Sequence, residues 1–276
     1  MNTFFCVFNA VKSAPEVARR QKIRYNPRMK YYSVEKFDST GLTKTVFTPR
    51  EDGKWKYGED GALDNYLELG NLLGITPDDM VRPSQTHTDI VRAVDRSSAG
   101  SGVVRPCEGG SCDGLVTNEK GLFLCTREAD CVPVFMLDPV SKAVGMVHSG
   151  WKGTAKLISA KAVELMKKCY GTKPSDLLIY LGPCICAGCY EVGGELIDDF
   201  SVNYSEQEIS RLFEKKDNGK YMLDVALGVR MSLEKCGISP GNITGPDWCT
   251  YHDGIFSSYR LEKSYTTHML TGIMLI

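Results

Sequence analysis

The sequence predicts an α/β (α+β) protein in which layered mixed β-sheets are flanked by helices in a single compact domain. Three observations predict this class. Strand-like apolar runs and segments of helical periodicity recur along the whole chain. No Pro/Ser/Gly-rich linker and no internal repeat divides them. Hydrophobic residues make up 42% of the 276 residues, which is enough for a sizeable core.

The first 30 residues differ from the rest in charge. Seven basic residues against the single acid Glu16 give this segment a charge of +6; they are Lys12, Arg19, Arg20, Lys22, Arg24, Arg28 and Lys30. An Arg-rich, acid-poor start also occurs in transit peptides, but a solvated surface segment is the favoured interpretation. We therefore expect a basic N-terminal segment, 1–30, followed by one domain, 31–276.

A helix and a strand are the first elements expected in the domain. Apolar spacing predicts an amphipathic helix over Leu63–Leu73, which Gly74 ends. The residues expected on its buried face are Leu63, Tyr66, Leu67 and Leu73. A strand is expected at Ile90–Val94, followed by a Gly/Ser/Cys-rich loop at 99–114.

The remainder alternates strands and helices. Apolar runs predict strands at Gly121–Thr126, Val132–Leu137, Lys142–Val147, Leu177–Leu181 and Met269–Ile276. The Asp138-Pro139 turn separates the second and third of these. Helices are expected over 153–169, 192–202, 206–216 and 225–236, and Asp224 can cap the last one.

Composition excludes several classes of function. The net charge of −1 gives no field for nucleic acid, and no apolar run approaches the roughly 18 residues of a membrane span. The N-terminus lacks the basic and apolar regions of a secretory signal, so we expect a cytoplasmic protein with reduced cysteines. Phosphate-binding P-loop, HExxH and Gly-x-Ser-x-Gly motifs are absent.

One group of residues points to metal chemistry. Cys131 precedes one predicted strand, and His148 ends the next, so the turn between them can bring the two side chains together. His87 lies before the strand at Ile90–Val94 and offers a second imidazole. One sulfur and two imidazoles with an open fourth position form a pattern typical of catalytic zinc, although unrelated positions remain an alternative on spacing alone.

Longer motifs resemble a known family. They cover most of the chain, from about Phe47 to the C-terminus: Phe47–Gly53, Gln85–His87, Cys112–Gly114, Thr126–Val134, His148–Gly153, Leu181–Ile185, Cys189–Val192 and Phe256–Arg260. The most specific pair is Ala-Asp-Cys-x-Pro followed by His-x-Gly-Trp. These motifs resemble the zinc-dependent purine nucleoside phosphorylase family, formerly labelled polyphenol oxidase or multicopper oxidase laccase-domain proteins.

The resemblance implies a site and an activity. His87, Cys131 and His148 would bind one zinc ion per chain. The implied reaction converts adenosine, inosine, guanosine or methylthioadenosine plus phosphate to the free base and a ribose-1-phosphate type product, with adenosine deamination alongside. The chain departs from the family in carrying Lys152 after the tryptophan, where arginine is usual, and in Thr267-His268 near the end.

Further residues are candidates for binding and catalysis. Backbone N–H groups from Gly150 to Gly153 could hold phosphate at a helix start, with Lys152 or Arg50 as countercharge, and Arg50 is also a candidate catalytic residue. Asp130 adjoins a predicted ligand and is the candidate proton carrier, although a turn role is an equal alternative. We expect purine nucleosides and phosphate as the partners, while the sequence leaves open whether the chain is a monomer or a small homo-oligomer.

Three other functions remain as alternatives. Cys131 and His148 could form the nucleophile and base of a cysteine hydrolase. A copper-binding polyphenol oxidase is disfavoured because the chain has only 4 histidines. A non-catalytic binding protein could use the same pocket. Separately, Cys184, Cys186 and Cys189 offer three thiols without a defined fourth ligand, and the sequence leaves their role open.

Overall fold

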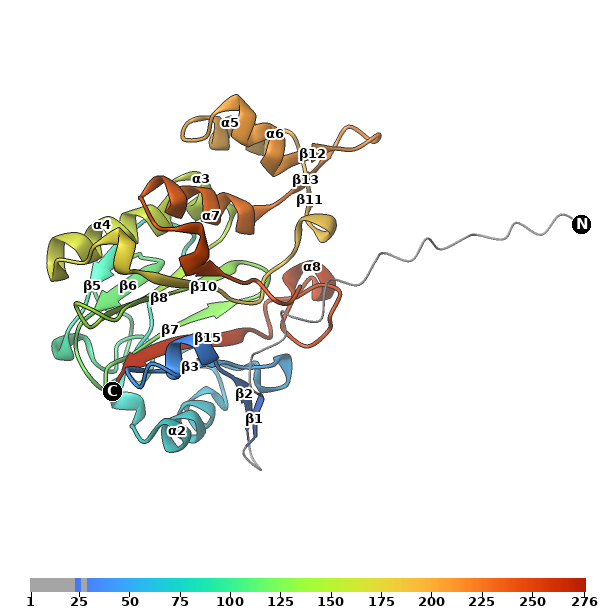
Figure 1. Ribbon diagram of the computed structural model, residues 1–276. Helices are drawn as coiled ribbons and strands as arrows, with labels where there is room; N and C mark the ends of the chain where they lie inside the picture. Colours follow the sequence, from blue (N-terminus) through green and yellow to red (C-terminus); the bar gives the residue numbers. More distant parts are fainter. Residues whose placement is uncertain (1–22, 26–28) are drawn as a thin grey trace, which may run out of the picture.

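The computed structural model describes residues 23–25 and 29–276, which form layers of sheets and helices (Figure 1). Within these residues, two six-stranded sheets pack face to face, and a three-stranded sheet stands apart from them. Helices cover the outer face of each large sheet, so the predicted layered α/β (α+β) fold is confirmed. In the same residues, no helix combines the length and apolar character needed to cross a membrane.

The first sheet joins strands from both ends of the chain. In spatial order it contains β1 (Ile23–Tyr25), β2 (Lys30–Tyr32), β3 (Thr43–Phe47), β15 (Met269–Leu275), β7 (Phe123–Glu128) and β4 (Met80–Val81). The predicted C-terminal strand, β15, pairs antiparallel with both β3 and β7. All its side chains are buried, because it lies in the middle of the sheet.

The second sheet is built around a buried hairpin. Its spatial order is β14 (Ile243–Thr244), β10 (Leu178–Leu181), β8 (Val132–Asp138), β9 (Ala143–Ser149), β6 (Gly114–Thr117) and β5 (Val91–Ala93). The Asp138 carboxylate closes the β8–β9 turn by accepting the backbone N–H groups of Val140 and Ser141 at 2.8 and 3.0 Å. Every residue of both strands is buried, which fits their continuous apolar sequences.

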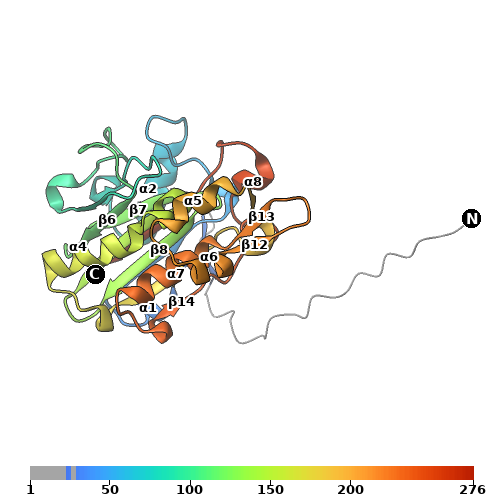
Figure 2. The same cartoon turned by 90° about the horizontal axis from the view of Figure 1, so that it is seen from above.

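The remaining elements surround these sheets. The small sheet contains β11 (Glu191–Val192), β13 (Tyr221–Leu223) and β12 (Phe213–Lys215). The helices are α1 (Glu35–Asp38), α2 (Ala62–Leu73), α3 (Trp151–Ala155), α4 (Ile158–Tyr170), α5 (Glu195–Ser201), α6 (Glu206–Leu212), α7 (Val225–Lys235) and α8 (Tyr259–Glu262). Figure 2 shows α4 and α7 lying across the second sheet. Figure 1 shows α2 beneath the first sheet.

The predicted helix over 153–169 is instead two helices, α3 and α4. Leu157 between them adopts a left-handed backbone with φ of +60°, which a continuous helix cannot contain. The break lets α4 lie on the second sheet against β9, β6 and β5. It also leaves α3 as a separate turn directly after the predicted ligand His148.

Two other local predictions need correction. The expected buried face of α2 was partly wrong, since Leu63 and Leu67 are 50% and 46% exposed while Tyr66 and Leu73 are buried. The true face includes Gly70, where a Cβ would come within 2.6 Å of the Ile75 carbonyl oxygen. The helix expected over 206–216 ends at Leu212, because the following residues pair with β13 in a hairpin.

The basic segment 1–30 lies mostly outside the described residues. Within it, β1 pairs with β2 in the first sheet. The division of the chain into 1–30 and 31–276 stays a prediction.

The cap of α7 gives a direct test of how the sequence specifies this fold. The Asp224 side chain accepts the Leu227 N–H at 2.8 Å, as its predicted N-cap role requires. Asp224→Ala should lower the free energy of unfolding by about 1 kcal/mol, whereas Asp224→Asn should retain most of it. Urea unfolding followed by circular dichroism measures the difference. Equal loss in both variants would contradict the capping role.

Candidate metal centre

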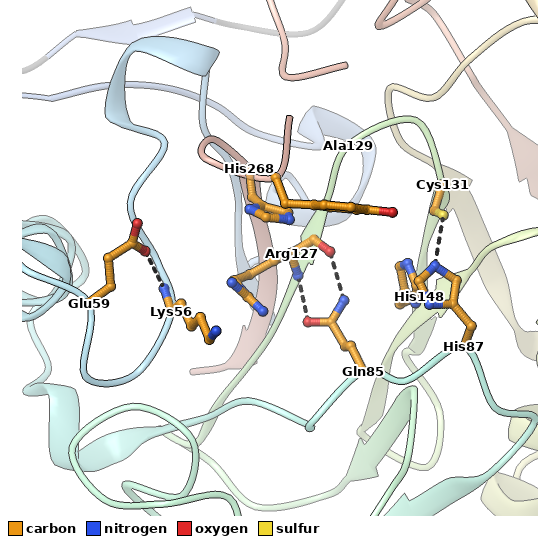
Figure 3. A pocket seen from close by; sticks show the side chains of 10 residues that line it. Lys56, Glu59, Gln85, His87, Arg127, Ala129, Cys131, His148 and His268 are labelled. Atoms are coloured by element: carbon orange, nitrogen blue, oxygen red, sulfur yellow. Dashed lines mark hydrogen bonds between the residues drawn. The ribbon is translucent and has the colours of Figure 1, made fainter. Parts of the chain in front are cut away.

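His87, Cys131 and His148 lie together where the chain passes between the two large sheets (Figure 3). One ligand atom from each lies within 4.8 Å of the others. The Cys131 Sγ is 3.9 Å from His87 Nε2, and the two imidazole ring centroids are 5.0 Å apart. The structure therefore brings together the three residues that the sequence singled out.

Strand register explains why Cys131 meets His148. β7 belongs to the first sheet and β8 to the second, and Cys131 lies in the short link between them. In the β8–β9 hairpin, Pro133 pairs with His148 and Val132 with Ser149. The turn after β8 thus returns the chain beside its start, as the sequence predicted.

The carboxylate of Asp113 holds the second imidazole in place. Asp113 is fully buried at the start of β6 and accepts the backbone N–H groups of Thr86, His87 and Thr88 at 3.2, 3.0 and 2.7 Å. These bonds fix the loop in which His87 adopts a left-handed φ of +60°. The position of His87 therefore depends on a residue 26 positions further along the chain.

Asp113 also orients His148. The His148 Nδ1 lies 2.9 Å from Asp113 Oδ1, and an ionised carboxylate only accepts hydrogen bonds, so Nδ1 carries the proton. Its Nε2 is then left for a metal or for Cys131. Burial raises the pKa of Asp113, but hydrogen bonds from His148 and Thr88 outweigh it and lower the pKa to about 2. The carboxylate is therefore ionised at neutral pH.

Cys131 and His148 stabilise each other's charged forms. Burial raises the pKa of Cys131, but the neighbouring imidazoles lower it below its usual range. Burial lowers the pKa of His148, and the Cys131 thiolate with Asp113 raises it. A thiolate is the form that binds metal. Burial also raises the pKa of the nearby Glu128 to about 7.

Gly150 allows the ligands to approach this closely. A Cβ at this position would lie 2.9 Å from the Cys131 Sγ and 3.0 Å from His87 Cδ2. Real Cβ atoms essentially never come that close to a neighbour, so any larger residue would push the thiol or the imidazole aside. Gly150 thus acts on the geometry of the site through its lack of a side chain.

A cavity of about 260 Å³ on one side of the ligands is basic. Its lining includes Lys56, Gln85, Arg127 and His268, together with the single acid Glu59, which accepts the Lys56 backbone N–H at 3.2 Å (Figure 3). Among the described residues no acid forms an ion pair with Arg127, and its Nε lacks a hydrogen-bond partner. Burial, and to a smaller extent the nearby charge of Arg82, lowers the pKa of Arg127 to about 10, so its guanidinium stays charged at neutral pH. Burial, and to a smaller extent the nearby charge of Arg127, lowers the pKa of His268 to about 4, so its imidazole is neutral at neutral pH.

A second cavity, of about 220 Å³, lies on the other side of the ligands and is aromatic. Its walls include Trp151, Tyr190, Tyr259 and Tyr265. Tyr259 and Tyr265 stack on each other with ring centroids 4.2 Å apart, and Arg260 lies over the Tyr190 ring. The two cavities share His87 and Cys131, so a single ligand can reach both while contacting the candidate metal centre.

The other residues predicted from sequence have different positions. Asp130 and Gly150 line the aromatic cavity. The described lining of the two cavities does not include Lys152, Gly153 or Arg50. The Lys152 ammonium lies 5.4 Å from the Trp151 ring centroid, and Arg50 pairs with Glu262 at 3.5 Å.

Asp130 is already bonded through both side-chain oxygens. It accepts the Thr250 hydroxyl and the Arg260 backbone N–H, each at 2.6 Å. It also has a left-handed φ of +87°, directly before the ligand Cys131. These contacts fix the link between β7 and β8. Its role as proton carrier stays a prediction.

Several residues of the site were missed from sequence. Asp113 lies in a motif that was recognised but given no role, and Lys56, Arg127 and His268 come from separate parts of the chain. A carboxylate between two glycine-containing segments could have suggested a buried acid. No local signal links Lys56 or His268 to the ligands, because only the packing of the first sheet brings them near.

Comparison with known proteins identifies relatives of this chain. The family model described as multi-copper polyphenol oxidoreductase laccase matches residues 59–276. A purine nucleoside phosphorylase of Bacteroides thetaiotaomicron is 34% identical over 203 residues, covering 72% of this chain and 74% of that protein. The adenosine deaminase RL5 of an unknown prokaryotic organism is 31% identical over 212 residues, covering 74% and 79% of the two chains.

A solved structure has the same fold. The hypothetical protein YfiH of Bacillus licheniformis superimposes with a TM-score of 0.83 at 29% identity, covering 92% of this chain and 99% of that one. The family model and the solved structure both match most of the chain. The chain therefore belongs to the multi-copper polyphenol oxidoreductase laccase family, whose relatives include proteins named purine nucleoside phosphorylase.

Proposed function

We propose that the chain is a zinc-dependent purine nucleoside phosphorylase, with adenosine deamination as a second activity of the same site. One observation carries the proposal: the His87, Cys131 and His148 group lies between a basic cavity and an aromatic cavity. In phosphorolysis a phosphate anion replaces a flat aromatic base at the anomeric carbon of one sugar, so the site must hold an anion and an aromatic ring on either side of that sugar. The relative named purine nucleoside phosphorylase supports this reaction, and the relative named adenosine deaminase supports the second activity.

The residues present suit zinc. One thiolate and two imidazoles, with a fourth side facing cavities, match the ligand set of catalytic zinc sites. The hydrogen bond from His148 to Asp113 is the support that zinc-binding histidines usually have. When bound, zinc supplies Lewis-acid polarisation of an oxygen atom of a substrate or of water. A copper oxidase remains disfavoured by the supply of histidines.

We place phosphate in the basic cavity. Arg127 provides a half-buried cation there that forms no ion pair among the described residues, and Lys56 adds an exposed one. The nucleoside base would then lie between the aromatic rings of the other cavity, where stacking suits any purine. In this arrangement a phosphate oxygen attacks the anomeric carbon of the sugar, and the bond between that carbon and the base nitrogen breaks. The sequence-based alternative, phosphate at Gly150–Gly153 with Lys152, would put the anion on the opposite side.

The leaving base needs a proton. Asp130 remains our proposed carrier, because it lines the aromatic cavity beside Cys131 and can take up a proton from water or from dihydrogen phosphate and pass it to the base nitrogen. Its hydrogen bonds to Thr250 and Arg260 hold the carboxylate in one orientation. Arg50, proposed from the sequence as a second catalytic residue, would have to act from its position beside Glu262.

The cysteine hydrolase alternative shares part of this geometry. Asp113, His148 and Cys131 are arranged as a carboxylate, a base and a nucleophile would be. The hydrolase gives no role to His87, which faces the same thiol at 3.9 Å. Alkylation separates the two: a zinc-bound thiolate is protected until a chelator removes the metal.

Product analysis with adenosine tests the proposed reaction. Adenine that appears only with phosphate indicates phosphorolysis, and inosine indicates deamination. Cys131→Ala should lose the zinc at this site. Loss of a residue that only supports a ligand costs roughly 10- to 100-fold in activity, so loss of the ligand itself should lower turnover by more than that. Cys169→Ala, at the exposed end of α4, is the matched control. Wild-type turnover in Cys131→Ala would reject the proposal.

Gly150 gives a test that leaves every ligand in place. Gly150→Ala should weaken zinc retention and lower turnover at least about 10-fold, because its methyl group would displace Cys131 or His87. Gly241→Ala is the control, since a Cβ there meets only the Ser239 hydroxyl at 4.0 Å. Chelator competition and adenine release are measured for both. Equal zinc retention in the two variants would contradict the steric argument.

The place of phosphate can be found from kinetics. Lys56→Ala and Arg127→Gln should each raise the KM for phosphate several-fold and leave zinc content unchanged, since each removes a cation from the basic cavity. Lys152→Ala should leave the KM for phosphate near the wild-type value. The opposite pattern would move the anion to the Gly150–Gly153 turn, and an effect of Arg50→Ala alone would place it near Arg50.

A further inference from the structure

A second group of metal-binding side chains lies outside the candidate metal centre. Cys186, Cys189, Cys249 and His252 each place one ligand atom within 4.8 Å of the other three. The His252 Nδ1 is 3.4 Å from the Cys189 Sγ and 3.8 Å from the Cys186 Sγ. The four residues come from two segments more than 50 positions apart, so the fold assembles the group.

Backbone pairing holds the two segments together. Cys184 and Cys249 form a parallel bridge, in which the Thr250 N–H donates to the Cys184 carbonyl at 3.0 Å. The turn at Ala187–Cys189 then brings Cys186 and Cys189 to the same side. The thiol of Cys184 is buried and is not in the group. The cysteine motif therefore contributes two ligands, Cys186 and Cys189, and Cys249 and His252 complete the group of four.

The spacing of these atoms suits tetrahedral zinc. Zn–S bonds of about 2.3 Å and Zn–N bonds of about 2.0 Å place a sulfur and a nitrogen about 3.5 Å apart on a tetrahedron. The contacts of His252 Nδ1 with the two thiols, 3.4 and 3.8 Å, lie on both sides of this value. Three thiolates and one imidazole in Cys-x-x-Cys and Cys-x-x-His pairs form a closed ligand set, which is typical of structural zinc.

Neighbouring groups support the same arrangement. The Cys186 backbone N–H donates to the Cys249 sulfur at 3.3 Å. The Asp253 Oδ1 lies 3.5 Å from His252 Nε2, which favours a proton on that nitrogen and leaves Nδ1 for a metal. The other oxygen of Asp253 accepts the Cys249 N–H at 2.8 Å.

We infer that Cys186, Cys189, Cys249 and His252 bind a second, structural zinc ion that fixes one wall of the aromatic cavity. Both joined segments hold Asp130: Ile185 donates its N–H to the Asp130 carbonyl at 3.0 Å, and Thr250 donates its hydroxyl to the carboxylate. Asp130 directly precedes Cys131. The second ion therefore secures the link that carries a ligand of the first.

Metal content and sulfur coordination test this inference on the full chain. The wild type should contain about two zinc ions, with an average of about two sulfur ligands per zinc by X-ray absorption. The double variant Cys186→Ser/Cys189→Ser should keep about one zinc, with about one sulfur ligand. Cys107→Ser/Cys236→Ser is the matched control, since these cysteines are half-buried like the first pair, and it should keep both ions.

The exposed histidine provides a variant that need not disturb folding. The His252 side chain is 56% exposed, so its replacement removes little packing. His252→Ala should release one zinc to a chelator at least about 10-fold faster than the wild type, whereas His252→Cys should retain it. Hydrogen exchange should quicken in 184–190 and 249–253 of the double variant.

The outcomes separate this site from the first. Cys131→Ser should lose only the zinc held by His87, Cys131 and His148 and should keep the zinc held by the Cys186, Cys189, Cys249 and His252 group. The test of the second site therefore stands even if the proposed phosphorylase activity is not found. A wild type with a single zinc that persists in Cys186→Ser/Cys189→Ser would overturn the inference. An intact mass showing a disulfide among the three thiols of freshly purified protein would overturn it as well.

Discussion

The buried carboxylate of Asp113 is the interaction on which the candidate metal centre depends. It accepts three consecutive N–H groups of the loop that carries His87 and also the Nδ1 proton of His148. One fully buried anion thus fixes the position of the His87 imidazole and determines which nitrogen of His148 carries the proton. Removing it would leave several buried donors without a partner, which costs more than the loss of any single hydrogen bond. The site is therefore preorganised before any metal binds.

The fold gives this centre two unlike sides. The chain crosses from the first sheet to the second at Cys131, so loops of both sheets border the thiol. The side formed with the first sheet is basic, and the side formed with α3 and the 184–190 and 249–260 segments is aromatic. A reaction between an anion and a purine nucleoside uses both sides at once. The Cys186, Cys189, Cys249 and His252 group lies behind the aromatic side and holds its segments together.

Local patterns in the sequence predicted the parts of the fold that depend on neighbours in the chain. The β8–β9 hairpin and the capped helix α7 follow from apolar runs, a turn and one N-cap, and the hairpin alone predicts that Cys131 meets His148. The split between α3 and α4 was missed because Leu157 carries no sequence signal for a left-handed backbone. Arg127 and His268 were missed because pairing of distant strands within the first sheet brings them near the ligands. The pairing of Cys186 with His252 was missed because two distant loops meet there, and periodicity does not report such contacts.

The most direct test of the metal centre is an anomalous difference map recorded on both sides of the zinc absorption edge from crystals of the full chain. Our account predicts a zinc peak bonded to Cys131 Sγ, His87 Nε2 and His148 Nε2, with its open side facing the two cavities. It also predicts that His148 Nδ1 remains bonded to Asp113. A map with no zinc peak among these three side chains, or with Cys131 covalently modified in an otherwise empty site, would contradict it.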